Sequence, residues 1–240
     1  MSQRFQTIEG MADENLQASH ESKRLLVMDV DSTLIDEEVI DMLGQAAGSG
    51  ECIAQITRRA MLGELDFKAA LAERVGLLEG MPASVLDEVY AKIHFTKGAL
   101  AMIDTAHSRG WKVGVVSGGF SELVNRLVAE AHIDHSLANG LEILDGTLTG
   151  KTVGTVVTKS TKLESLHQWA EEDGVAMSRT VAIGDGANDI PMIEAAGIGI
   201  AFCAKPAVQQ AAHYAITQRD LMQVISIIDE HDRLFDRAGV

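Results

Sequence analysis

Two aspartates, one residue apart, follow a short apolar run near the start of the chain. Residues 25–28 are all apolar, which predicts a buried strand, because a strand covered on both faces shows a continuous apolar run. Asp29 and Asp31 would then lie at its carboxyl end, where open α/β sheets bind ligands. Both carboxylates would share one side of the chain if it stays extended. Their repulsion would be offset by a hard cation such as Mg²⁺, and a solvated aspartate turn is the alternative.

A second polar cluster, Ser117-Gly118-Gly119, follows the predicted strand 111–116 and precedes a predicted helix. A hydroxyl and free backbone N–H groups at the start of a helix could bind an anion. A serine that caps the helix is an equally good interpretation.

A third cluster, residues 185–189, follows the predicted strand 180–183 and contains Asp185, Asn188 and Asp189. It lacks the alternating oxygen ligands of a calcium loop. Because the carboxyl ends of parallel strands meet at one edge of a sheet, three acidic side chains from two strands would most simply share one Mg²⁺.

These groups together fit the transfer of a phosphoryl group to a carboxylate. Asp29 would attack phosphorus, and Asp31 would protonate the leaving alkoxide and later deprotonate a water molecule. Mg²⁺, Ser117 and Lys162 would neutralise the charge on the transferred oxygens. Taken alone, Lys162 is more simply a solvated lysine of the predicted helix 159–173.

The elements that would position these groups alternate between helix and strand after residue 97. Helices are expected at 98–109, 120–131, 159–173, 190–196, 206–212 and 221–234; strands at 111–116, 133–138, 180–183, 199–202 and 214–216; and a hairpin at 142–157. This alternation predicts an α/β fold whose parallel sheet is covered by helices on both faces. Residues 37–96 show only helical periodicity, which predicts an all-α insertion that caps the site.

Composition excludes several classes of protein. The chain has 240 residues, of which 46% are hydrophobic, so it can bury a large core. Its net charge of −15 argues against a nucleic-acid partner. No apolar run approaches the ~20 residues of a membrane helix, and the polar start does not look like a signal peptide. Two cysteines far apart in the sequence favour a reducing, cytoplasmic location.

Four motifs, in order, resemble those of the haloacid dehalogenase (HAD) superfamily: Asp29-Val30-Asp31-Ser32-Thr33, Val116-Ser117-Gly118-Gly119-Phe120, Lys162 and Gly184-Asp185-Gly186-Ala187-Asn188-Asp189. The resemblance covers about residues 23–228 and is strongest to the branch that hydrolyses O-phospho-L-serine. It implies a Rossmann-like core formed by 22–36 and 97–240, a helical cap at 37–96 that sets substrate specificity, a β-hairpin flap, and a flexible tail at 1–21.

The resemblance also implies a role for each matching residue. Asp29 would be the nucleophile and Asp31 the general acid and base. The implied Mg²⁺ ligands are Asp29, the backbone carbonyl of Asp31, and Asp185. Phosphate would be bound by Ser117, Gly118, Lys162 and Asn188, with Asp189 supporting phosphate and metal.

In the implied cap, Glu38 would bind the substrate ammonium and Arg74 its carboxylate, while Met61 and Phe67 would form an apolar wall. Without the resemblance, each of these is more simply a solvated charge or a helix-core residue.

The expected function is therefore Mg²⁺-dependent hydrolysis of O-phospho-L-serine, the last step of serine biosynthesis, by a cytoplasmic monomer or homodimer. The expected partner is this small molecule, with no nucleic acid and no membrane. Alternatives are phosphoryl transfer to another hydroxyl acceptor, hydrolysis of another small phosphate ester, and a non-catalytic protein that binds a phosphorylated ligand. The short leader argues against a preceding regulatory domain.

Overall fold

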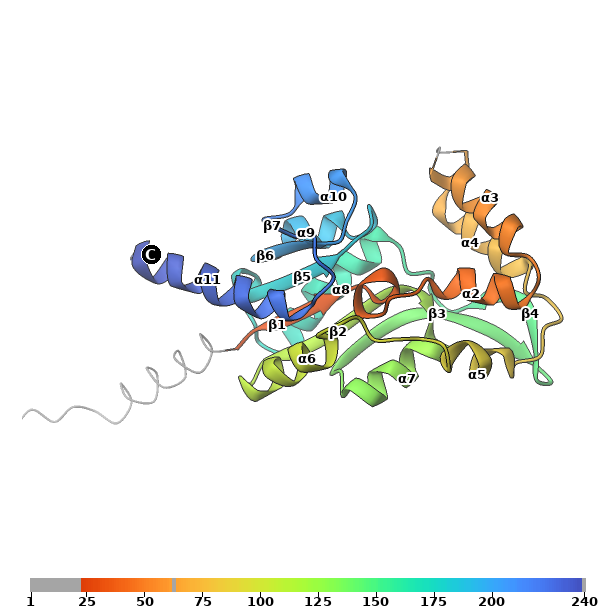
Figure 1. Ribbon diagram of the computed structural model, residues 1–240, viewed down its shortest axis with the longest axis horizontal. Coiled ribbons are helices and arrows are strands. Elements are labelled where there is room, and N and C mark those ends of the chain that lie inside the picture. Colours follow the sequence, from red (N-terminus) through yellow and green to blue (C-terminus); the bar gives the residue numbers. More distant parts are fainter. Residues whose placement is uncertain (1–22, 62–63, 239–240) are drawn as a thin grey trace, which may run out of the picture.

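The computed structural model describes residues 23–61 and 64–238 (Figure 1). The expected tail at 1–21 lies outside the described residues. In the part of the chain that is described, no helix combines the length and apolar character needed to cross a membrane.

One seven-stranded sheet has the order β4-β3-β2-β1-β5-β6-β7. Its strands are β1 (Leu25–Met28), β2 (Lys112–Phe120), β3 (His135–Leu144), β4 (Thr147–Val153), β5 (Thr180–Gly184), β6 (Ile198–Phe202) and β7 (Tyr214–Ile216). All neighbours pair in parallel except β3 and β4. The predicted α/β class with a parallel sheet is therefore confirmed, and the first strand lies at its centre.

Helices cover both faces of this sheet. Outside the segment 37–96 they are α6 (Ala99–Ser108), α7 (Ser121–Ala131), α8 (Lys159–Glu172), α9 (Ile190–Ala195), α10 (Pro206–Ala211) and α11 (Met222–Ala238). Leu26 and Met28 of β1 face the core shared with α6, α7 and α11, whereas Leu25 and Val27 face the core shared with α8, α9 and α10. All four side chains are fully buried, and such burial contributes about 1.5–3 kcal/mol for each large apolar side chain.

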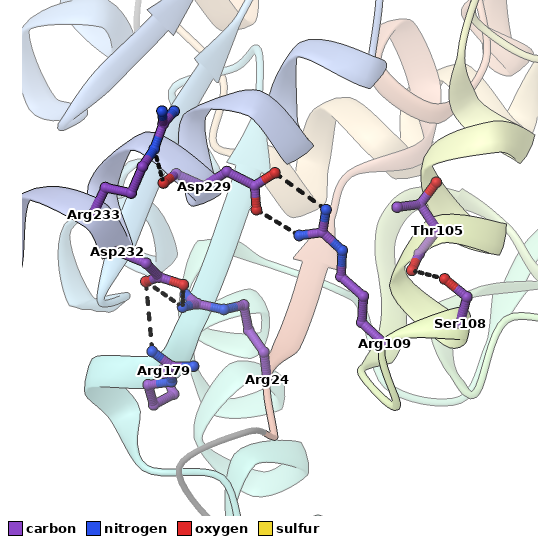
Figure 2. A network of polar contacts seen from close by, with 8 residues as sticks. All are labelled: Arg24, Thr105, Ser108, Arg109, Arg179, Asp229, Asp232 and Arg233. Atoms are coloured by element: carbon purple, nitrogen blue, oxygen red, sulfur yellow. Dashed lines mark hydrogen bonds and ion pairs between the residues drawn. The ribbon is translucent and has the colours of Figure 1, made fainter. Parts of the chain in front are cut away.

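Helix α11 is fixed to the sheet's amino edge by arginine–aspartate pairs (Figure 2). Arg24 donates from Nη2 to both carboxylate oxygens of Asp232, at 2.7 and 2.9 Å. Arg109 makes a two-pronged contact with Asp229, at 2.5 and 3.1 Å. Both arginines also lie against the ring of Trp111. This network lies away from the polar strand ends and holds α11 in place.

Four helices lie between β1 and α6: α2 (Val39–Ala46), α3 (Gly50–Met61), α4 (Phe67–Gly76) and α5 (Val85–Tyr90). We call them the helical insertion. The two linkers that join it to the sheet run side by side, with Ile35 opposite Phe95 in an antiparallel bridge. The N–H of Thr96 donates to the carbonyl of Leu34 at 2.9 Å.

The hairpin β3–β4 reaches the helical insertion. Its turn, Asp145-Gly146, has positive φ at both positions, 49° and 74°, as a tight two-residue hairpin turn requires. Reciprocal backbone bonds join β4 to the loop before α5: Gly80 N–H to the Leu148 carbonyl at 2.9 Å, and Leu148 N–H to the Met81 carbonyl at 2.8 Å. The hairpin is therefore bonded to the insertion.

Two expected boundaries are wrong. The strand expected to stop at residue 116 continues as β2 to Phe120, because Phe120 pairs with Asn139 across an irregularity in the register. The short strand expected at 133–138 and the first arm of the hairpin are one strand, β3. Both strands are therefore longer than expected.

Candidate active site

A cavity of about 380 Å³ lies between the polar strand ends and the helical insertion. Its lining from the sheet side includes Asp29, Asp31, Gly118, Gly119, Asp185, Asn188 and Lys205, and its lining from the insertion side includes Glu38, Thr57, Phe67 and Arg74. The structure thus brings together residues that are up to 176 positions apart, from Asp29 to Lys205.

Lys162 lies buried behind this cavity, between two carboxylates. Its Nζ is 2.8 Å from Oδ1 of Asp29 and 2.7 Å from Oδ1 of Asp189. Burial lowers the pKa of Lys162, but the charges of Asp189 and Asp29 outweigh it and raise the pKa above its usual value. The lysine is therefore charged and fixed within α8, and the alternative of a solvated lysine is excluded.

Asp29 combines one bonded oxygen with a high pKa. Its Oδ1 accepts the N–H of Val30 at 2.7 Å in addition to the Lys162 contact. Burial and the charge of Asp189 raise the pKa of Asp29 to about 7, against the opposing effect of Lys162. A further positive charge at this carboxylate would favour its ionised form.

Asp31 lies in a tight turn directly after Asp29. The turn is closed by the N–H of Ile35, which donates to the carbonyl of Val30 at 3.0 Å. Burial, with the charges of Glu38 and Asp29, holds the pKa of Asp31 well above its usual value. Its Oδ1 is buried and has no hydrogen-bond partner among the described residues. A carboxyl group with a raised pKa, next to a second carboxyl group, is suited to proton transfer.

Three carboxylates, those of Asp29, Asp185 and Asp189, have oxygen atoms within 4.8 Å of one another and could hold a metal ion. The two oxygens of Asp189 already bind Lys162 and the N–H of Gly186, the latter at 3.0 Å. Burial and the charges of Asp189 and Glu38 raise the pKa of Asp185 to about 6. Hard oxygen donors whose ionised forms repel one another fit a hard divalent cation, with Asp29 and Asp185 as the carboxylates that are available to it.

Ser117 and Gly118 lie inside β2 and not at the start of a helix, so the interpretation of Ser117 as a helix cap is wrong. The helix α7 begins at Ser121. The hydroxyl of Ser117 instead accepts the N–H of Gly119 at 2.8 Å. A Cβ atom on Gly119 would lie 3.2 Å from Oδ2 of Asp31 and 3.0 Å from the Ser117 hydroxyl, so even a methyl group would be tightly packed at this position. The glycine brings the end of β2 against Asp31.

Glu38, Phe67 and Arg74 approach the cavity from the insertion. The side chain of Glu38 accepts the hydroxyl of Ser32 at 2.6 Å. Burial lowers the pKa of Arg74 despite the opposing charges of Asp41 and Glu38, and its Nε donates to the carbonyl of Ala70 at 3.1 Å. Among the described residues its terminal nitrogens have no acidic partner. The side chain of the fourth predicted residue of this group, Met61, lies outside the described part of the chain.

Sequence reasoning missed Asn139, which supports the strand end from behind. Asn139 is buried, and its amide nitrogen donates to the carbonyl of Gly118 at 2.8 Å. Its amide oxygen accepts the N–H of Val157, also at 2.8 Å. The sequence offered no signal for this role, because the predicted strand ended at residue 138, before Asn139. Its orientation follows from these two bonds.

Comparison with known proteins adds to this geometry. A model of the family described as haloacid dehalogenase-like hydrolase matches residues 26–194. A Streptococcus thermophilus protein named phosphoserine phosphatase is 60% identical over 210 residues, which cover 88% of this chain and 98% of that protein. A Lactococcus lactis protein of the same name is 56% identical, covering 87% and 97%.

Solved structures of proteins with the same name also match this chain. A substrate-bound phosphoserine phosphatase complex matches with a TM-score of 0.81 and 40% identity, over 85% of this chain and 98% of that one. A structure described as a phospho-aspartyl intermediate analogue of phosphoserine phosphatase matches with the same score, identity and coverage.

Proposed function

We propose that this chain, which belongs to the haloacid dehalogenase-like hydrolases, hydrolyses O-phospho-L-serine to L-serine and inorganic phosphate. The observation that carries the proposal is a single cavity lined by Asp29 and Asp31 on one side and by Glu38 and Arg74 on the other. The first pair suits a phosphate ester, and the second suits the ammonium and carboxylate of an amino acid. Relatives of similar length carry the name of this activity.

In the first half-reaction, a carboxylate oxygen of Asp29 forms a bond to phosphorus and the ester P–O bond breaks. Asp31, whose burial raises its pKa and so favours its protonated form, gives its proton to the departing serine oxygen. Lys162 holds Asp29 in place from behind and adds positive charge next to the transferred group. The products of this step are serine and an aspartyl phosphate.

In the second half-reaction, Asp31 accepts a proton from a water molecule as the water oxygen attacks phosphorus. The bond between phosphorus and the Asp29 oxygen breaks, which releases phosphate and restores both carboxyl groups. Ser117, Gly118 and Asn188 would bind the phosphate oxygens, and Asp189 would support them through Lys162. One residue thus serves as acid and then as base.

We propose Mg²⁺ as the cofactor, held by Asp29, Asp185 and the backbone carbonyl of Asp31. When bound, it supplies positive charge that ionises Asp29 and lowers the repulsion between carboxylates and phosphate. The acidic cluster supports this choice, because its donors are all hard oxygens.

Substrate recognition belongs to the helical insertion in this proposal, so residues 37–96 act as a cap on a core formed by 22–36 and 97–240. Glu38 would bind the ammonium group and Arg74 the carboxylate, as a guanidinium suits. Phe67 would form the apolar wall with Met61; its ring end lies 3.6 Å from where a Cβ on Gly118 would stand, so it reaches across the cavity. Closure of this cap would exclude water before attack.

Release of phosphate from phosphoserine, in Mg²⁺ and then in EDTA, tests the proposal. We expect turnover that EDTA abolishes and added Mg²⁺ restores. A panel of small phosphate esters, with and without acceptor alcohols, separates this function from hydrolysis of another ester and from phosphoryl transfer. Binding of the ester without turnover would instead indicate a non-catalytic phospho-ligand protein, and the proposed function would be wrong.

We further propose a cytoplasmic protein that acts as a monomer or homodimer on this small substrate in serine biosynthesis, without nucleic acid or membrane partners. One observation supports the location: Cys52 and Cys203 are free and exposed, which suits a reducing compartment. The net charge of −15 supports the exclusion of nucleic acid.

A further inference from the structure

Arg219, in the segment between β7 and α11, contacts three separate parts of the junction between the sheet and the helical insertion. Its Nη2 donates to the carbonyl of Ser32 at 2.9 Å. Its Nη1 donates to Oδ1 of Asp36 at 3.0 Å and to the hydroxyl of Thr96 at 3.2 Å. The guanidinium also lies over the ring of Phe202, 5.6 Å from its centroid. One side chain therefore joins the C-terminal part of the chain to the turn that carries Asp31.

The segment that carries Arg219 is itself held in place. The N–H of Leu221 donates to the carbonyl of Lys97 at 2.9 Å. The side chain of Asp220 pairs with Lys97 at 2.8 Å. The backbone next to Arg219 is therefore bonded to the start of α6. This places the guanidinium where it can position the junction.

The backbone conformation of Ser32 needs a stabilising contact such as the one from Arg219. Ser32 has φ 57°, in the left-handed region that residues other than glycine rarely adopt, so neighbouring contacts must stabilise its conformation. Its hydroxyl donates to Glu38 at 2.6 Å. A change in the Ser32 backbone would therefore move the support of Glu38, which lines the cavity.

The two linkers of the insertion share the same arginine. Asp36 belongs to the outgoing linker and Thr96 to the returning one, and the Thr96 hydroxyl also donates to Asp36 at 3.2 Å. The N–H of Asp36 donates to the carbonyl of His94 at 3.0 Å. Arg219 thus contacts both linkers where they leave the sheet.

We propose that Arg219 is a positioning residue for recognition of the substrate ammonium: it fixes the Ser32 turn, so that the Ser32 hydroxyl holds Glu38 at the cavity, and it anchors both linkers. The part that concerns ammonium rests on the proposed function. Arg219 does not line the cavity, so it acts through Ser32 and Glu38 and does not touch the substrate itself.

The test compares Arg219→Gln and Arg219→Lys with the matched control Arg109→Gln. Arg109 has the same side-chain exposure, 35% against 36%, and pairs with one aspartate at the far edge of the sheet. One readout is hydrogen exchange at the amides of Asp36 and Thr96. The other compares the KM for phosphoserine with the inhibition constant of inorganic phosphate, which carries no ammonium.

For Arg219→Gln we expect faster exchange at both amides and a KM for phosphoserine raised about tenfold, the usual effect of losing one hydrogen bond to a charged group, with phosphate inhibition changed less than about twofold. Both readouts for Arg219→Lys should lie between those of Arg219→Gln and those of the unmodified protein. Arg109→Gln should match the unmodified protein in both readouts. Should Arg219→Gln fail to fold, Asp36→Asn removes the charge from one of the same contacts with little change of shape.

Unchanged exchange at Asp36 and Thr96 would overturn the inference, and so would equal changes in the KM and in phosphate inhibition. If the unmodified protein releases no phosphate from phosphoserine, the proposed function is wrong and the ammonium part of the inference fails with it. The exchange measurement still decides whether Arg219 anchors the junction.

Discussion

The ammonium of Lys162 and the N–H of Val30 bind the same oxygen of Asp29, Oδ1, at 2.8 and 2.7 Å. Among the described residues, Oδ2 is therefore the oxygen of Asp29 without a protein donor. A carboxylate held by one oxygen and open at the other is oriented for attack in a single direction. This asymmetry underlies the first two predictions.

Replacement Asp29→Asn should abolish turnover and preserve binding of the phosphate group. The amide keeps the shape of the carboxylate but cannot form the acyl phosphate, so we expect kcat for phosphoserine to fall by at least about a thousandfold. Phosphate binding should persist, because the substitution removes a negative charge from the cavity. Calorimetric titration with inorganic phosphate and a phosphate-release assay measure the two effects. Asp104→Asn, an exposed change on α6, is the control, and retained turnover in Asp29→Asn would exclude Asp29 as the nucleophile.

Replacement Lys162→Gln should destabilise the fold as well as remove activity. Two buried carboxylates, Asp29 and Asp189, would lose their shared cation, and breaking a buried pair costs about 3–5 kcal/mol. Urea denaturation should show this loss in the free energy of unfolding. Lys151→Gln, an exposed lysine of β4, should change it by less than about 0.5 kcal/mol. Equal stability of the two variants would mean that Lys162 is not needed to neutralise these carboxylates.

Much of this site could be predicted because its parts are short-range. The apolar run before Asp29 and the run before Asp185 each predict a strand, and the carboxyl ends of parallel strands meet at one edge. Asp29 and Asp31 both follow the first strand, although the chain turns at Val30–Leu34 and does not stay extended through Asp31. The proximity of these carboxylates could therefore be predicted without any knowledge of how the core packs.

Other parts depend on contacts that the local sequence does not encode. Three residues of types that end strands, Ser117, Gly118 and Gly119, led to a strand that was too short, whereas pairing with β3 extends β2 through them. Asn139 and Arg219 belong to no local pattern that marks a site. Arg219 contacts Ser32 across 187 positions, so its role emerges only when the chain is folded.

The acidic cluster predicts that the stability of the protein depends more strongly on pH when the metal is removed. In EDTA, the folded-state pKa values of Asp29, about 7, and Asp185, about 6, lie above the usual 3.8. The folded state therefore binds protons that the unfolded state does not, and the free energy of unfolding should rise as the pH falls from 8 to 5, by on the order of 1–3 kcal/mol.

Saturating Mg²⁺ should reduce this dependence, because the cation offsets the same repulsion that raises both pKa values, and it should stabilise the protein most at pH 8. Thermal denaturation at a series of pH values, with EDTA and with Mg²⁺, measures the difference between the two profiles. Other titrating groups contribute equally to both and cancel. Parallel profiles would show that the cation does not bind at these carboxylates.

Arg74 and Glu38 predict separate losses of specificity. Arg74→Lys keeps the charge but not the two-pronged geometry, so the KM for phosphoserine should rise about tenfold, while that for phosphoethanolamine, which has no carboxylate, should not change. Glu38→Gln should affect both of these esters and spare phosphoglycolate, which has no ammonium. Steady-state kinetics on the three esters checks both statements. Equal effects of each variant on all three would contradict the assigned recognition roles.

Asn139 predicts that a residue outside the cavity controls phosphate binding. Its amide nitrogen holds the Gly118 carbonyl, and its amide oxygen accepts the N–H of Val157, so the two ends of this side chain have different partners. Asn139→Asp keeps the shape and the Val157 bond but loses the donor to Gly118. It also buries a negative charge next to a carbonyl oxygen. This is unfavourable because the charge loses its hydration and because the two oxygens repel each other.

We therefore expect Asn139→Asp to weaken inhibition by inorganic phosphate, and to raise the KM for phosphoserine, by about tenfold or more, since Gly118 lines the cavity and the peptide it carries would no longer be fixed. Asn125→Asp, an exposed change of the same kind on α7, should leave both constants unaltered. Product-inhibition kinetics compares the two variants. Because the carboxyl group introduced by Asn139→Asp could, once protonated, again donate to Gly118, the defect should lessen at low pH; a defect independent of pH would mean that the lost donor is not its cause.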